Sequence, residues 1–392
     1  MDFNKIHNRL GTYCTQWDFI KDRFGEKDLL PFSISDTDFL VPKQIQDQLF
    51  KNVEHGIFGY TRWRHNDYLN AISNYFKRRF DTHIDKSWII YSPSVMYSVS
   101  ILLRQLCNDG DAVAVFNPMY DAFIDVIENN SLKINSVLLN SSEGKFVYDP
   151  EELELAISKS KVFLLCSPHN PTGRLWTNAE LEEIIMLAKK YHVFVISDEI
   201  HMDVNLSSRK HQPILKYLKD YPNIALVSSV SKTMNTPALG GSYAIIPNNE
   251  LYDAFQQITR KRDFVNSASI MGIEACMIGY RDCDDYIEEL NLYIKQNMNL
   301  LKEYLLENIP EFTFDIPEAT YLAWIDTRSS GFSMKAIQDS LIKNGKVAIM
   351  DGRTYGSGGE GYLRMNVACP KAKLIEGLNR MNMAMNCLRG GN

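Results

Sequence analysis

The sequence predicts an α/β protein with a large, mostly parallel β-sheet domain covered by helices and a smaller C-terminal α/β domain. Three observations predict this fold class. From residue 88 onward, short and nearly continuous apolar runs alternate with longer segments of helical spacing, the pattern of strands buried on both faces. Polar clusters directly follow four of these runs, where open α/β sheets bind their ligands. A chain of 392 residues has room for one large and one smaller domain.

The first two parts of the chain are an arm and the large domain. Residues 1–45 are mixed and rich in aromatic side chains, and we expect an N-terminal arm that packs with the small domain. Residues 46–282 form the predicted large domain, in which residues 68–80 and 95–107 have helical character. The apolar runs that we expect to be its strands are 88–91, 112–116, 162–166, 193–197, 224–227 and 243–246.

Residues 283–392 form the predicted small domain, which begins with a long connecting helix. This helix is predicted from a three-to-four spacing of apolar residues over about five turns. The residues with this spacing are Ile287, Leu290, Ile294, Met298, Leu301 and Leu305. The β-like runs expected after the helix are 319–325, 347–350 and 362–367.

The composition is that of an ordinary globular protein and excludes several classes of function. Hydrophobic residues make up 45% and charged residues 23% of the chain. A net charge of −6 gives no basic face for nucleic acid. The seven cysteines are scattered and form no CxxC pair or Cys/His cluster, so we expect free thiols and no metal. Neither a signal core nor a membrane span is visible, and a cytoplasmic protein is expected.

The stretch from Ser228 to Gly241 carries the most informative residue, Lys232. A lone lysine is usually a solvated surface charge. This one follows a strand-like run and lies among small residues, where an amine is partly desolvated and its pKa is lowered, as amine chemistry requires. The hydroxyls of Ser229 and Ser231 suit a phosphate. We predict that Lys232 carries pyridoxal phosphate as a Schiff base.

Other strand ends supply partners for the ring of this cofactor. Asp198 is expected to hold the protonated ring nitrogen, because pyridoxal chemistry drains negative charge into that ring. Asn170 is expected to donate to the phenolic oxygen, with His201 as a second partner, and Tyr120 to stack on the ring face. Each also has an ordinary structural interpretation: a loop or capping aspartate, turn chemistry, a structural histidine and a core tyrosine.

Two further groups complete the predicted site. Ser94, Val95 and Met96 open a helix, so their backbone N–H groups can hold the phosphate. Arg364 lies in a β-like run where an exposed edge charge is the common case, but its guanidinium suits a substrate α-carboxylate. The glycine-rich residues 352–361 before it are expected to form a flexible flap.

Together these pieces resemble a known family. The motifs 167–173 (SPHNPTG), 197–201 (SDEIH), 229–232 (SVSK) and 362–366 (YLRMN) resemble fold-type I pyridoxal-phosphate enzymes of the class I/II aminotransferase group, which have the aspartate aminotransferase-like fold. Within that group the resemblance is to the MalY/PatB-type cystathionine β-lyases, or C–S lyases. It is carried by residues 11–18, 34–39, 58–63, 235–239 and 347–350, and it covers nearly the whole chain.

The resemblance implies a homodimer in which Tyr60 reaches the phosphate of the partner's cofactor. Many aminotransferases of the group carry an arginine eight residues after the Schiff-base lysine, whereas this chain has Gly240. The MalY-like enzymes also tend to lack that arginine, so the resemblance favours a lyase. It implies α,β-elimination from L-cystathionine and related S-substituted L-cysteines, with Lys232 as the catalytic base, to give homocysteine or another thiol, pyruvate and ammonia.

Two other functions stay open from the sequence. An aminotransferase shares every step up to the loss of the Cα proton, but it needs a keto acid acceptor. A regulatory protein that binds a partner on this fold is the second alternative, and the retained Lys232, Asp198 and Arg364 speak against an inactive enzyme. The order of preference among cystathionine, cysteine, cystine and longer thioethers is not fixed by the sequence.

Overall fold

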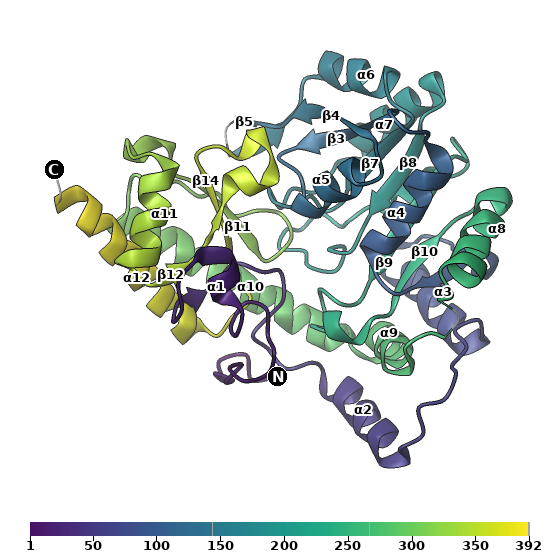
Figure 1. Cartoon of the computed structure of the whole chain (residues 1–392), viewed down its shortest axis with the longest axis horizontal. Helices are drawn as coiled ribbons and strands as arrows, with labels where there is room; N and C mark the ends of the chain where they lie inside the picture. Colours follow the sequence, from purple (N-terminus) through teal and green to yellow (C-terminus); the bar gives the residue numbers. More distant parts are fainter. Residues whose placement is uncertain (143, 266, 391–392) are drawn as a thin grey trace.

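A computed structural model describes residues 1–142, 144–265 and 267–390, and a seven-stranded sheet forms the centre of its larger part (Figure 1). The strands lie in the order β2-β10-β9-β8-β7-β3-β4, and only β10 runs antiparallel to its neighbours. The expected mostly parallel sheet is therefore confirmed. Its strands are β2 (Ile89–Ser92), β3 (Ala112–Asn117), β4 (Lys133–Leu138), β7 (Val162–Cys166), β8 (Phe194–Asp198), β9 (Ile224–Ser229) and β10 (Ser242–Ile245).

Helices cover both faces of this sheet, because successive strand residues point to opposite sides and nearly all are apolar. Val113 and Val115 pack in one apolar cluster with α4 (Val95–Leu106), α5 (Asp121–Glu128) and α8 (Asn249–Gln257). Ala114 and Phe116, one residue out of phase, belong to the cluster on the other face. The helices of that cluster are α3 (Asn66–Phe80), α6 (Pro150–Ser158), α7 (Asn178–Tyr191) and α9 (Ile270–Asp282).

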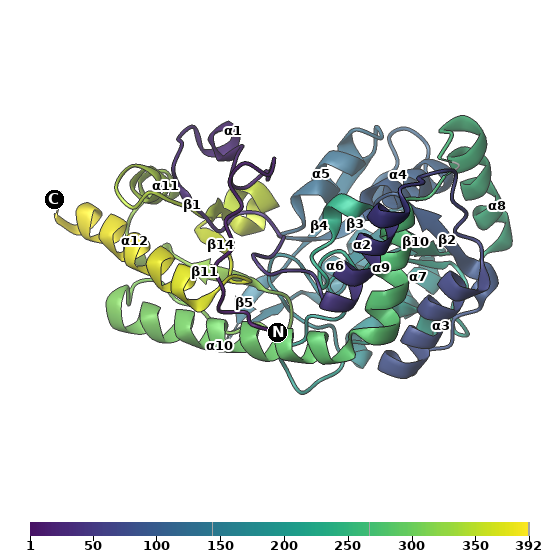
Figure 2. The ribbon, with the colours of Figure 1, turned by 90° about the horizontal axis from the view of Figure 1, so that it is seen from below.

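The predicted long helix is α10 (Asp284–Asn308), and it buries all six apolar residues whose spacing predicted it. In Figure 2 it runs along the lower edge of the molecule, from the α9 end to α12 (Lys371–Gly390). Beyond it, β11 (Leu322–Asp326), β14 (Tyr362–Asn366) and β13 (Met350–Asp351) form a three-stranded antiparallel sheet beside α11 (Met334–Lys343). Within the described residues, no helix has both the length and the apolar character that a membrane crossing requires.

The N-terminal residues run over the last third of the chain before they reach the large sheet. After α1 (Ile20–Phe24), β1 (Leu30–Pro31) pairs in parallel with β12 (Val347–Ala348), and α2 (Lys43–His55) follows. The Phe32 ring lies so close to α12 that a Cβ on Gly377 would come within 2.3 Å of it, so glycine is needed there. Away from this region, β5 (Asn140–Ser142) pairs antiparallel with β6 (Lys145–Val147). The division at residues 45 and 282 stays a prediction.

Candidate active site

A cavity of about 160 Å³ lies at the carboxyl edge of the large sheet, beyond the ends of β7, β8 and β9. Ligands bind at this edge in open α/β sheets. Ten of the twelve predicted site residues line it: Ser94, Val95, Met96, Tyr120, Asn170, Asp198, His201, Ser229, Ser231 and Lys232. The two that do not are Arg364, which contacts a lining residue, and Tyr60. The structure therefore brings together side chains from four strand ends and one helix start.

Lys232 lies half-buried in this cavity, three residues after the end of β9. Its Nζ donates a hydrogen bond of 2.8 Å to the backbone carbonyl of Ser35. Burial lowers the pKa of the Lys232 amine, and the nearby Arg364 acts in the same direction, while the carboxylates of Asp36 and Asp198 oppose the shift. An amine of lowered pKa is more often neutral near pH 7, and the neutral form is the one that acts as a nucleophile and a base.

Asp198 ends β8 and faces the same cavity. Burial raises the pKa of its carboxyl to about 7, although the backbone N–H of Ile200, 3.1 Å from Oδ1, and the charge of Lys232 lower it. A cation beside this carboxylate would stabilise its charged form and return the pKa toward the usual value. The protonated nitrogen of a pyridine ring is such a cation, so Asp198 fits the predicted cofactor.

His201 and Asn170 are both buried in the cavity wall. Burial lowers the pKa of His201 to about 3, with help from Lys232 and Arg364, so the imidazole is neutral. Its Nδ1 is buried and has no hydrogen-bond partner among the described residues. Asn170 accepts a 3.1 Å hydrogen bond at Oδ1 from Arg364. A buried orphan nitrogen is rare in a folded protein and fits a polar ligand atom.

The start of α4 and the end of β9 offer donors to an anion. The Ser94 hydroxyl caps α4 by accepting from the backbone N–H of Tyr97 at 3.1 Å. The first-turn N–H groups of Val95 and Met96 have no intrahelical partners and carry the positive end of the helix dipole. The Ser229 hydroxyl, by contrast, is engaged within the protein, donating to Gly241 and accepting from the Ser231 N–H. These groups fit a phosphate, with Ser229 shaping the loop.

Arg364 lies at the centre of β14 and is 4% exposed. It donates to Asn170 and to the carbonyl of Ser33 at 2.9 Å, and its guanidinium lies 4.4 Å from the centroid of the Tyr355 ring. Its Nε has no partner among the described residues. A buried guanidinium with an unused N–H is suited to a carboxylate. The tyrosine expected to stack on the cofactor, Tyr120, also lines the cavity, and burial raises its pKa to about 12.

Tyr60 does not line the cavity, and the glycine-rich residues 352–361 do not form the expected flap. Tyr60 is 99% exposed on a segment without regular structure, so its predicted role in a partner's site stays a prediction. The flexible flap was a wrong expectation, because residues 352–359 form two short helical turns in which Gly352, Tyr355 and Gly359 are buried. A Cβ on Gly359 would lie 1.8 Å from the Gly352 carbonyl, and the Gly358 N–H donates to Asn117. Glycine here allows tight packing.

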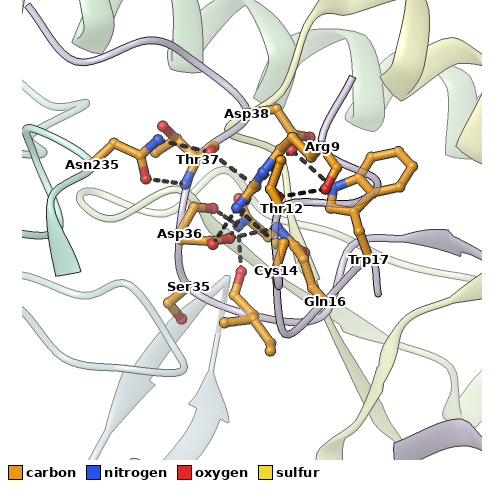
Figure 3. A network of polar contacts seen from close by, with 12 residues as sticks. Arg9, Thr12, Cys14, Gln16, Trp17, Ser35, Asp36, Thr37, Asp38 and Asn235 are labelled. Carbon is orange, nitrogen blue, oxygen red and sulfur yellow. Dashed lines mark hydrogen bonds and ion pairs between the residues drawn. The ribbon is translucent and has the colours of Figure 1, made fainter. Parts of the chain in front are cut away.

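Sequence reasoning missed the N-terminal segment 33–38 as a wall of the site. Ser35 lines the cavity and binds Lys232, and the segment is fixed from both sides. Arg9 donates to Asp36 at 2.7 Å, and Asn235 exchanges two 3.0 Å hydrogen bonds with the backbone of Thr37 (Figure 3). The sequence marked this segment as part of the motif 34–39 that carries the resemblance, but it gave no sign that a backbone carbonyl there binds Lys232.

The chain is similar to known proteins over nearly its whole length. Protein MalY of Escherichia coli (strain K12) is 40% identical over 390 residues, which are 99% of this chain and 100% of MalY. Cystathionine beta-lyase PatB of Bacillus subtilis (strain 168) is 33% identical, over 98% of this chain and 100% of PatB. The crystal structure of cystalysin from Treponema denticola, which contains pyridoxal 5'-phosphate, superposes with a TM-score of 0.93 at 29% identity and covers 99% of both chains.

These likenesses confirm the resemblance to MalY and PatB and the aspartate aminotransferase-like fold expected from the sequence. The family model described as aminotransferase class I and II matches residues 27–381. The chain belongs to the aminotransferase class I and II family.

Proposed function

We propose that this protein is a pyridoxal-phosphate-dependent C–S β-lyase. Its substrates are L-cystathionine and related S-substituted L-cysteines, and its products are homocysteine or another thiol, pyruvate and ammonia. The observation that carries the proposal is a half-buried lysine amine that shares one cavity with a carboxylate of raised pKa and lies near a buried guanidinium. The relative named cystathionine beta-lyase PatB supports the lyase reaction.

The proposed reaction divides the work among three side chains. Pyridoxal phosphate, when bound, supplies the electron sink for the negative charge that develops at Cα. Arg364 binds the substrate carboxylate, and Asp198 keeps a proton on the ring nitrogen. Lys232 Nζ removes the Cα proton. The Cβ–S bond then breaks with its electron pair on sulfur, and Lys232 returns a proton to the thiolate. Water converts the remaining three-carbon fragment to pyruvate and ammonia.

Gly240 supports the choice of a lyase over an aminotransferase. Its backbone has φ +71° and ψ −161°, a conformation that is open to glycine and strongly disfavoured for other residues. The arginine that many aminotransferases carry at this position would therefore need a different loop. We assign the phosphate instead to the start of α4 and to Ser231, with Ser229 supporting the loop.

The decisive experiment supplies L-cystathionine to the purified protein without any keto acid. Pyruvate and a free thiol should appear in equal amounts and at a steady rate, measured with lactate dehydrogenase and a thiol reagent. Lys232→Ala should lower kcat about 10²- to 10⁴-fold, the usual loss for a missing general base. A surface substitution, Lys43→Ala, should have no effect. Product that forms only after a keto acid is added would identify an aminotransferase and refute the lyase proposal.

We also propose that the protein works as a homodimer in the cytoplasm. Tyr60 would then complete the phosphate site of the partner subunit. In the residues before it the chain exposes further large apolar side chains, at Phe50, Val53, Ile57 and Phe58, as expected for a surface that a second copy covers. All seven cysteines are unpaired, which suits a reducing compartment.

A further inference from the structure

The backbone carbonyls of residues 33–36 all accept hydrogen bonds from side chains of the site or its rim. Because the segment has no regular secondary structure, these bonds fix where its oxygens point. The donors are Arg364 to Ser33 at 2.9 Å, Asn366 to Ile34 and to Asp36 at 2.6 Å each, and Lys232 to Ser35 at 2.8 Å. The Ser35 carbonyl thus marks where the Lys232 amine rests when it is not bound to another group.

A second donor reaches the same Ser35 oxygen. Tyr321, fully buried beside the start of β11, places its hydroxyl 3.1 Å from the Ser35 carbonyl and 3.5 Å from the backbone carbonyl of Lys232. Its ring packs edge-on against His201 in the cavity wall. A tyrosine has a single hydroxyl proton, and the shorter contact is the stronger one. Tyr321 therefore links the N-terminal segment to the loop that carries Lys232.

Of the two donors to the Ser35 carbonyl, Lys232 leaves during the proposed reaction and Tyr321 stays. In the proposed reaction, on which this inference rests, Lys232 leaves the Ser35 carbonyl to react with the cofactor and with the Cα proton. Ser35 is a buried residue, and a carbonyl left without a donor away from water is costly. Tyr321 carries out no step of the reaction, so its hydroxyl is the partner that stays. It keeps the oxygen satisfied and in place each time the amine departs.

We propose that Tyr321 is a positioning residue for Lys232. Its hydroxyl holds the Ser35 carbonyl fixed, so that the released amine returns to one docking point. Without that hydroxyl, the flexible side chain of Lys232 would be the remaining donor on the oxygen, and it cannot orient a backbone group. The neighbouring carbonyls, held by Asn366, keep the segment folded, so the loss is local.

The test compares Tyr321→Phe with Tyr221→Phe. Both changes keep a buried ring and remove a hydroxyl bonded to a backbone carbonyl, since Tyr221 donates to Val193 at 2.9 Å. Tyr221 lies before β9 and Val193 before β8, at the opposite edge of the sheet from the cavity. The Tyr221 hydroxyl also accepts a 3.3 Å hydrogen bond from Asn223. Tyr221→Phe therefore controls for the loss of a buried hydroxyl and its hydrogen bonds away from the site.

The first readout needs neither cofactor nor turnover. The full chain, freed of pyridoxal phosphate, is treated with a limiting amount of an acetylating reagent, and labelling of Lys232 is followed by mass spectrometry against the exposed Lys43. We expect Lys232 to be labelled roughly 3- to 10-fold faster in Tyr321→Phe, the effect of weakening about one hydrogen bond, and at the wild-type rate in Tyr221→Phe. Wild-type labelling of Lys232 in Tyr321→Phe would overturn the proposal, as would equal acceleration in both variants.

The second readout uses the holoenzyme with L-cystathionine. Misplacing the base should lower kcat about tenfold and leave KM within about twofold, because substrate contacts are kept. A raised KM with unchanged kcat would assign Tyr321 to substrate binding and refute the positioning role. If wild-type protein releases no pyruvate, the proposed lyase function fails. The labelling experiment still decides whether Tyr321 fixes the Ser35 carbonyl that binds Lys232.

Discussion

Asp198 shows how a single buried carboxylate is tuned for a cationic ligand. It lies at the end of β8, away from water, and burial raises its pKa to about 7 although Lys232 is close. Folding the protein without a ligand therefore either costs free energy for a buried charge or keeps a proton on the carboxyl. A bound ring cation removes this cost. The same burial that destabilises the free protein at neutral pH should strengthen cofactor binding.

Asp198→Asn should make the cofactor-free protein more stable at neutral pH. The folded pKa of about 7 lies above the usual 3.8, so the native state binds the extra proton and stability falls as the pH rises from about 4 to about 7. Asparagine has no such dependence. Measured by urea unfolding, the free energy of unfolding of the variant should rise relative to that of wild type across this pH range. The difference should grow by at most about 4 kcal/mol over three pH units. A difference that is flat with pH would contradict this account. With added cofactor, wild type should instead be the more stable of the two proteins.

At the scale of single residues, the sequence was most informative where a side chain follows a strand. Asp198 and Lys232 could be predicted because the carboxyl ends of parallel strands meet at one edge. Ser35 and Tyr321 could not, because Ser35 acts through a backbone carbonyl, which any residue has. Tyr321 acts through a hydroxyl whose partner is 286 residues away in the chain. No residue-type pattern encodes such contacts.

Among the elements, the N-terminal segment depends on buried charges for its position. Asp38, 7% exposed, binds Lys373 of α12 at 2.5 Å and Arg9 at 2.8 Å. Burial opposes ionisation of Asp38, but these two cations hold its pKa below the usual value. Lys373 also packs over the Trp17 ring. Residue 38 ends the segment that presents Ser35 to Lys232, so this network (Figure 3 shows its Arg9 side) supports the wall of the site.

Lys373→Met should destabilise the protein strongly, because it leaves Asp38 buried with one of its two cations removed. Loss of one partner of a buried pair typically costs about 3–5 kcal/mol, and Arg9 keeps the effect near the lower end. The matched control is Lys43→Met, which removes an exposed i,i+4 pair with Asp47 and should change little. Urea unfolding of the cofactor-free proteins measures both. If the two variants had similar free energies of unfolding, the buried Lys373–Asp38 pair would not stabilise the packing of the N-terminal segment.

Elements with a clear period could be predicted, and irregular ones could not. α10 buries the six apolar residues whose spacing predicted it, so its existence followed from spacing alone. Residues 33–38 form no helix or strand, because their donors come from β14 and from the loop after Lys232. In residues 352–359, glycine composition predicted mobility, but the glycines serve close backbone packing.

At the scale of the whole molecule, a single chain leaves Tyr60, a predicted site residue, outside the lining of the cavity. Tyr60 is almost fully exposed beside the apolar side chains of Ile57 and Phe58. An exposed cluster of this kind is costly in water and is typical of a surface that another chain covers. In a two-fold dimer both copies of the loop are buried by one symmetric contact. Tyr60 then has a function only if the loop reaches the partner's site.

Mixing two inactive variants should restore activity if each site uses residues from both subunits. Lys232→Ala lacks the base but supplies an intact Tyr60, and Tyr60→Ala supplies the base. After denaturation and refolding of an equal mixture, half of the dimers are mixed, and each mixed dimer has one intact site of two. Pyruvate release from L-cystathionine should therefore reach about a quarter of the wild-type rate, well above either variant refolded alone. If Tyr60 served its own chain, every site would keep a defect and mixing would restore nothing.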